Sequence, residues 1–133
     1  MIYALVVEDE EDIRNLLVEL LADKGCSVRK ANNGSVALRL ISKRMPDIIF
    51  VDIMMPVMDG IEFISRLQEN PETAGIPVVL VTGVSTPAVT MKAVGLGVRF
   101  RLAKPWEQSE FDFVFEQSLE NKTGELDIPA ARR

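Results

Sequence analysis

Five polar residues stand at or just after the ends of short apolar runs: Glu8, Asp9, Asp52, Thr82 and Lys104. If these side chains meet, the three carboxylates repel one another, which raises carboxyl pKa values unless a cation intervenes. Oxygen ligands without nitrogen or sulfur select a hard ion such as Mg²⁺. A carboxylate beside Mg²⁺, with an ammonium and a hydroxyl nearby, suits attack on a phosphoryl group, in which Asp52 would become an acyl phosphate.

Each of these residues also has a simpler interpretation when it is taken alone. Asp52 would be a solvated strand-end cap, and Lys104 would be a surface charge. The acidic run continues through Glu10, Glu11 and Asp12, which we interpret as the start of a helix, where the macrodipole attracts negative charge. Only a shared position at one edge of the fold makes a functional site the better interpretation.

The composition limits what kind of protein this is. The chain has 133 residues, of which 47% are hydrophobic and 26% charged, as is typical of one globular domain. It has no histidine and one cysteine, Cys26, which we interpret as a small buried hydrophobe; zinc sites and histidine-assisted nucleophiles are nearly excluded. The net charge of −5 argues against direct binding of nucleic acid. The apolar runs are too short for a membrane helix or a signal peptide, so we expect a cytoplasmic location.

Two kinds of segment alternate along the chain, and their order predicts the fold class. Short apolar runs rich in Val and Ile predict strands buried on both faces, at 2–7, 47–51, 77–82 and 98–103, with a weaker candidate at 27–31. Apolar residues at helical spacing predict helices between these runs and after the last of them. Five βα units of this kind predict a parallel sheet covered on both sides, and in such sheets ligands bind at the carboxyl ends of the strands.

Local signals predict where some helices begin and end. Gly25 is placed to end the first helix. Asp59, with Glu62 three residues later, predicts a capping box at the start of the third. The fourth is expected to begin at a capping residue followed by a proline, around Ser85, Thr86 and Pro87.

Four motifs in this order give the chain a family resemblance. They are "VVEDE" after the first strand, "DIMMPVMDG" at 52–60, "LVTG" around Thr82, and "AKP" with Lys104 and Pro105. The chain resembles the receiver domain of bacterial two-component response regulators over about residues 2–120. The resemblance implies an α/β fold, a flavodoxin-like (βα)5 three-layer sandwich whose parallel five-stranded sheet has the order 2-1-3-4-5. We expect a receiver domain at 1–120 and a flexible polar tail, or the start of a linker, at 121–133.

The resemblance also implies a role for each matching residue. Asp52 is the phosphoacceptor; Asp9, Asp52 and the backbone carbonyl of Met54 bind Mg²⁺, and Glu8 acts mainly through water. Lys104 pairs with the phosphoryl group, and Thr82 bonds to it and reports its presence. The Lys104–Pro105 peptide bond is expected to be cis, an isomer that X-Pro bonds reach at low cost.

Four positions depart from the usual family pattern. Glu8 stands where Asp is commoner, and it is a longer acid that the family also uses. Met54 and Val84 are apolar where members often carry polar groups that affect the hydrolytic water, so the lifetime of the phosphorylated form is left open. Arg101 stands where the family usually has an aromatic switch residue. Phe100 is adjacent, but strand alternation directs it to the opposite face. Arg101 is therefore expected to place a charge on the output face, which the fourth helix, fifth strand and fifth helix form.

The resulting functional hypothesis is a phosphorylation-controlled switch, not an enzyme beyond its own phosphorylation and dephosphorylation. Its partners would be a histidine kinase or phosphotransfer protein and an unidentified downstream protein; it would be a monomer or a phosphorylation-dependent homodimer, alone or within a longer protein. One alternative is a degenerate receiver that binds partners without phosphorylation. A second is a small Mg²⁺-dependent aspartyl phosphatase, which often needs a second acid where this chain has Met54. A flavin or nucleotide carrier would need a glycine-rich loop after the first strand.

Overall fold

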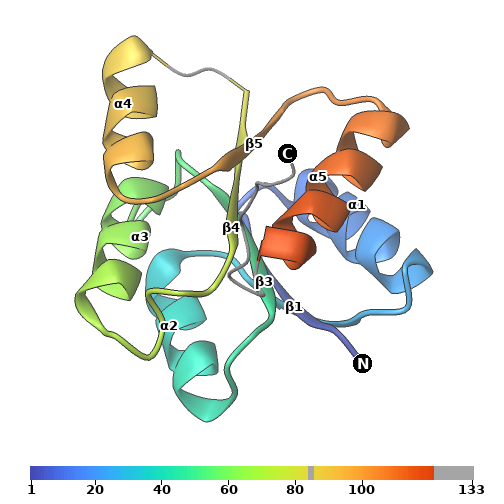
Figure 1. The fold of residues 1–133 in the computed structure, drawn as a ribbon, viewed down its shortest axis with the longest axis horizontal. Helices are drawn as coiled ribbons and strands as arrows, with labels where there is room; N and C mark the ends of the chain where they lie inside the picture. Colours follow the sequence, from blue (N-terminus) through green and yellow to red (C-terminus); the bar gives the residue numbers. More distant parts are fainter. Residues whose placement is uncertain (84–85, 122–133) are drawn as a thin grey trace, which may run out of the picture.

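The computed structural model describes residues 1–83 and 86–121, and strands alternate with helices throughout (Figure 1). Val84, Ser85 and the predicted tail from residue 122 onward lie outside the described residues. The elements are β1 (Tyr3–Val7), α1 (Glu11–Asp23), β2 (Ser27–Ala31), α2 (Gly34–Lys43), β3 (Ile48–Asp52), α3 (Gly60–Glu69), β4 (Val78–Thr82), α4 (Pro87–Gly95), β5 (Phe100–Ala103) and α5 (Gln108–Asn121).

The five strands form one parallel sheet in the order β2-β1-β3-β4-β5, which confirms the predicted fold. Helices α2, α3 and α4 cover one face, and α1 and α5 cover the other (Figure 1). The chain runs outward from β1 to β2 and then returns to β3 on the other side of β1. The strand order therefore reverses between β1 and β3, at the point where open α/β sheets bind ligands.

Two hydrophobic clusters, one on each face, hold the layers together. Every residue of β1, β3 and β4 is buried, so alternate side chains fill the two faces in turn. On the α1/α5 face, the rings of Phe50 and Phe111 stack with centroids 5.6 Å apart, and Phe111 stacks on Phe115 at 6.2 Å. Full burial of side chains of this size contributes about 1.5–3 kcal/mol each, so the core can support polar residues placed at the strand ends.

The helix boundaries follow the predicted local signals with one exception. Gly25 follows α1 with a φ of +87°, and the Thr86 hydroxyl caps α4 by accepting from the Val89 amide (3.2 Å). At α3, Asp59 accepts from the Glu62 amide (2.8 Å), but the Glu62 carboxylate pairs with Arg66 (3.2 Å). Only the Asp59 half of the predicted capping box is therefore observed.

Some boundaries differ from the sequence prediction. The first strand begins at residue 3 instead of 2, and the fifth at residue 100 instead of 98, because residues 97–98 still belong to the turn that ends α4. Asp52 is the last residue of β3 and pairs with Val81, instead of following the strand. Cys26 is half-buried against the α1/α5 cluster, less enclosed than expected.

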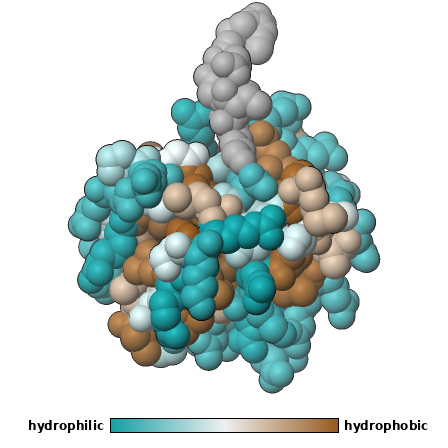
Figure 2. Space-filling model, turned by 90° about the horizontal axis from the view of Figure 1, so that it is seen from below, coloured by the Kyte–Doolittle hydropathy of each residue, from teal (hydrophilic) through white to brown (hydrophobic). Residues whose placement is uncertain are grey.

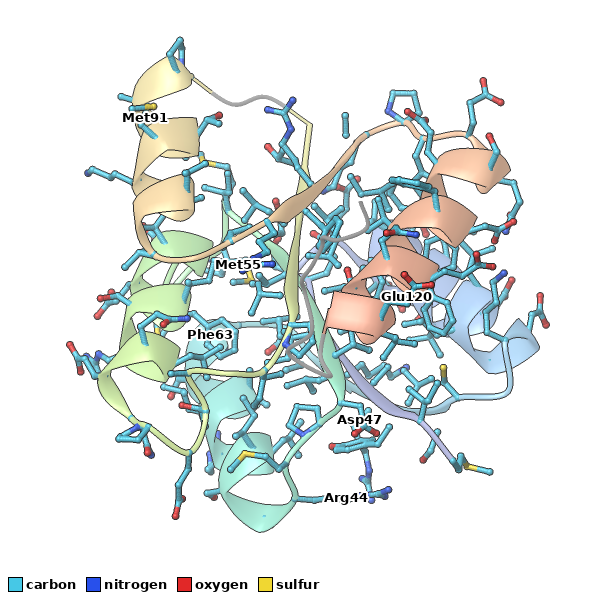
Figure 3. All side chains as sticks on the ribbon, viewed as in Figure 1. Arg44, Asp47, Met55, Phe63, Met91 and Glu120 are labelled. Carbon is cyan, nitrogen blue, oxygen red and sulfur yellow. The ribbon has the colours of Figure 1, made fainter. Side chains whose placement is uncertain are left out.

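The edge where the strands begin lies far from the polar residues described below. There Asp47 accepts from the Tyr3 amide (2.8 Å), and the Arg44 guanidinium lies 4.2 Å from the centre of the Tyr3 ring; Arg44 and Asp47 are neighbours in Figure 3. Figure 2 views the molecule from this side and shows hydrophobic and hydrophilic residues interspersed. The described part of the chain contains no helix long and apolar enough to cross a membrane.

Candidate functional site

The carboxyl ends of four strands bring the predicted site residues to one edge of the sheet. Glu8 and Asp9 follow β1, Asp52 ends β3, and Thr82 ends β4. The Lys104 amide donates to the Thr82 carbonyl (2.8 Å), which continues the pairing of β4 with β5 beyond Ala103. The parallel register therefore places a lysine beside carboxylates that are distant in sequence.

Three carboxylates form a cluster at this edge. Glu8, Asp9 and Asp52 each offer an oxygen, and these oxygens lie within 4.8 Å of one another. Glu8 is fully buried and Asp52 is 6% exposed, whereas Asp9 faces solvent. A cluster with two buried acids and one open side could hold a metal ion that is reached from solvent.

Lys104 is the cation that faces this cluster. Its ammonium nitrogen lies 3.1 Å from Glu8 Oε1, 3.5 Å from Asp52 Oδ2 and 3.7 Å from Glu10 Oε1. Burial acts to lower the pKa of Lys104, but the bond to Glu8 and the charges of Glu8, Asp52 and Glu10 outweigh it, so the pKa is raised. Lys104 therefore stays charged and is shared among three carboxylates.

Glu8 is a carboxyl group whose ionised form is disfavoured by its surroundings. Burial, assisted by the charge of Asp52, raises its pKa to about 7 from an ordinary value of 4.5, against the opposing effects of the Glu10 amide and Lys104. Its Oε2 accepts from the Glu10 amide (3.2 Å), and its buried Oε1 lies 3.1 Å from the ammonium of its ion-pair partner Lys104. A hard divalent cation fits this set of carboxylate oxygens, because it would offset the repulsion between Glu8 and Asp52.

Asp52 itself is held loosely. Its Oδ1 accepts from the Met54 amide at 3.4 Å, and its Oδ2 lies 3.5 Å from Lys104, both long for hydrogen bonds. The Met54 side chain is 73% exposed. The described contacts therefore leave the Asp52 oxygens able to accept a new bond.

The loop after β3 is shaped by close backbone packing and one strained turn. The Gly60 amide donates to the Ile53 carbonyl (2.8 Å), and a Cβ on Gly60 would lie 2.2 Å from the Asp52 carbonyl oxygen, so only glycine fits. The Met58 amide donates to the Pro56 carbonyl (2.7 Å) across Val57, whose φ is +69°. This is a γ-turn with a β-branched residue in the left-handed region, an unfavourable conformation.

Comparison with known proteins identifies the family of this chain. Residues 4–114 match the response regulator receiver domain family. This chain belongs to that family. It is thus a receiver domain of the kind used in two-component signalling systems.

Relatives of the receiver domain occur both alone and within larger proteins. Chemotaxis protein CheY of Halobacterium salinarum is 34% identical over 78% of this chain and 85% of its own length. A histidine kinase of Formosa agariphila is 33% identical over 89% of this chain, but the chain spans only 8% of the kinase. The crystal structure of the signal receiver domain of an HD domain-containing protein from Pseudomonas fluorescens superposes with a TM-score of 0.86 at 26% identity, covering 93% of this chain and 98% of that one.

The structure also shows where the remaining residues singled out from the sequence lie. Thr82 is buried at the end of β4, and the Lys104–Pro105 peptide bond is cis. Phe100 packs with the α1/α5 cluster, while Arg101 is exposed, so strand alternation separates them as predicted. The carbonyl of Met54 as a metal ligand stays a prediction.

Two receiver residues at this edge were not singled out from the sequence. Arg14 donates to the carbonyls of Glu8 (3.1 Å) and Asp9 (3.4 Å), which fixes the backbone of the acidic loop. Glu10 stands at the N-cap of α1, as its interpretation as part of a helix start requires, and its carboxylate also lies 3.7 Å from the Lys104 ammonium. A possible signal for Arg14 was a basic residue in the first turns of α1, where the macrodipole disfavours positive charge.

Proposed function

We propose that this receiver domain is a phosphorylation-controlled signalling switch in which Asp52 accepts a phosphoryl group in the presence of Mg²⁺. The observation that carries the proposal is the meeting of Glu8, Asp9 and Asp52 within 4.8 Å, with the Lys104 ammonium 3.5 Å from Asp52. Carboxylates with a hard cation and an ammonium are the groups that phosphoryl transfer needs. A histidine kinase or a phosphotransfer protein supplies the phosphoryl group.

Each residue has a separate role in the transfer. An Asp52 oxygen forms a bond to phosphorus while the bond from phosphorus to the donor's nitrogen or oxygen breaks, and the electron pair leaves with that donor atom. Lys104 pairs with the phosphoryl oxygens, and the Thr82 hydroxyl bonds to one of them. Glu8, Asp9, Asp52 and the Met54 carbonyl would hold Mg²⁺, which supplies charge neutralisation at those oxygens when bound.

The output is a change in protein contacts. The new charge on Asp52 biases the arrangement of the segments around Thr82, and a downstream protein reads the result. We assign the receiver to 1–120 and a polar tail to 121–133, a cytoplasmic location, and a monomer or a phosphorylation-dependent homodimer. The net charge of −5 supports a protein target over nucleic acid.

The decisive experiment uses a small phosphodonor. The protein is incubated with Mg²⁺ and acetyl phosphate, and the intact mass of the wild type is compared with that of Asp52→Asn. We expect one phosphoryl adduct on the wild type and none on the variant. An unmodified wild type would support the degenerate receiver, and repeated turnover of a phosphate ester would support the phosphatase, a reaction that the apolar Met54 disfavours.

Arg101 tests the proposed output face. It is exposed on β5, and Arg29, exposed on β2 at the other edge of the sheet, is a matched control. We expect Arg101→Tyr, but not Arg29→Tyr, to change the oligomeric state of the phosphorylated protein, as measured by light scattering with sedimentation. Equal behaviour of the two variants would remove Arg101 from the output face.

A further inference from the structure

Glu10 occupies the N-cap position of α1 but does not cap the helix. Its backbone is extended, with φ −81° and ψ 114°, and its side chain makes no capping hydrogen bond. Ser, Thr, Asp and Asn are the residues that favour this position, because their short side chains reach the free amides of the first turn. The carboxylate of Glu10 therefore does not satisfy the free amides of the first turn of α1.

The Glu10 carboxylate lies on the solvent side of Lys104. Its Oε1 is 3.7 Å from the Lys104 nitrogen, and the Glu10 side chain is 63% exposed while that of Lys104 is 16% exposed. The Glu10 amide also donates to Glu8 Oε2 (3.2 Å), which anchors the residue beside the cluster. Glu8 and Asp52 face the ammonium from the protein interior, so Glu10 is the exposed one of the three carboxylates that pair with Lys104.

We propose that Glu10 is an electrostatic brake on phosphorylation: it occupies Lys104 in the unphosphorylated protein and repels anionic phosphodonors. The inference rests on the proposed function, since it concerns access to Lys104 during transfer to Asp52. A phosphoryl group that pairs with Lys104 competes with the Glu10 carboxylate for the ammonium. Glu10 thus sets the rate of transfer without contacting the reacting atoms.

Three variants distinguish the effect of Glu10 on the phosphorylation rate from its effect on the stability of α1. Glu10→Gln removes the charge. Glu10→Ser removes the charge and adds a favourable N-cap. Glu11→Gln makes the same change of net charge one residue later, at an exposed position in the first turn of α1. The initial rate of adduct formation with Mg²⁺ and acetyl phosphate is measured by intact mass at low and high salt, and stability is measured by urea unfolding.

We expect both Glu10 variants to be phosphorylated about two- to fivefold faster than the wild type at low salt, the size expected for loss of a partly exposed ion pair. The gain should shrink at high salt, because salt screens exposed charges. Glu11→Gln should match the wild type in rate, and Glu10→Ser should have a raised urea midpoint. Equal rates for Glu10→Gln and Glu11→Gln, on a wild type that does form its adduct, would overturn the brake while leaving the proposed function intact.

Discussion

Raising the pH from 5 to 8 should destabilise the metal-free receiver, and Glu8 should be the cause. Its folded pKa of about 7 lies above its ordinary value of 4.5 because burial and Asp52 disfavour the charged form. Between these two values the folded protein holds a proton that the unfolded chain has lost. Stability is therefore fully present below 4.5, falls as the pH rises, and is lost above about 7.

The size of the effect follows from the two pKa values. Each tenfold difference in proton affinity is worth about 1.4 kcal/mol, so the wild type should lose about 2–3 kcal/mol between pH 5 and pH 8. In a domain of this size, such a loss lowers the urea midpoint by about 1–2 M. The chain contains no histidine, so no imidazole titrates between pH 5 and pH 8. The shifted groups Asp112, Cys26 and Lys104 have ordinary values of 3.8, 9.0 and 10.5, outside this range.

The assay is urea unfolding in EDTA at pH 5, 6, 7 and 8, with Glu8→Gln as the control. The amide has nearly the shape of the protonated carboxyl group and does not titrate, so the variant should keep its midpoint across the range. The reasoning would be refuted if wild type and Glu8→Gln showed the same pH dependence. Added Mg²⁺ should restore more stability to the wild type at pH 8 than at pH 6, since the metal needs the ionised carboxylate.

Three further substitutions, with Gly95→Ala in α4 as a control, test the geometry around the site. Gly60→Ala should lower the free energy of unfolding by about 3 kcal/mol, because the new Cβ meets the Asp52 backbone. Gly95→Ala should be neutral or stabilise by up to about 1 kcal/mol, because a Cβ there has nothing within 4 Å. Equal urea midpoints for the two variants would contradict the close packing at Gly60. Val57→Gly should stabilise by up to about 1 kcal/mol, since relief of the left-handed φ exceeds the entropy cost of glycine; a lower midpoint would show that the turn is not strained. Arg14→Gln should weaken Mg²⁺ binding about tenfold in a fluorescence titration, whereas an unchanged affinity would deny Arg14 any part in positioning the acidic loop.

The fold could be predicted because each of its determinants is local in the sequence. Short continuous apolar runs rich in Val and Ile, such as residues 48–51, are typical of strands buried on both faces, and helical spacing between them favours a parallel sheet. A parallel sheet places the residues after its strands at one edge, whatever their separation along the chain. The meeting of Asp9, Asp52 and Lys104 followed from that rule without knowledge of any side-chain contact.

The orientation of individual side chains could not be predicted, because it depends on partners supplied by other strands. Glu10 has the composition of an ordinary helix start, and only the lysine that follows β5 draws its carboxylate away from the helix. Arg14 likewise bonds to carbonyls that no periodicity describes.

The structure nevertheless adds a usable signal, which is conflict between a residue type and its local conformation. Glutamate is a poor N-cap, and valine is a poor residue for a left-handed turn, yet the chain has Glu10 and Val57 in those places. Three acids around one lysine add repulsion at the same edge. Because natural chains are otherwise locally consistent, conflicts that gather at one edge of a sheet indicate where selection has favoured function over stability. If that inference is sound, relieving the conflicts at Glu10 and Val57 should stabilise the fold, and the Glu10 change alone should alter the rate at which Asp52 is phosphorylated.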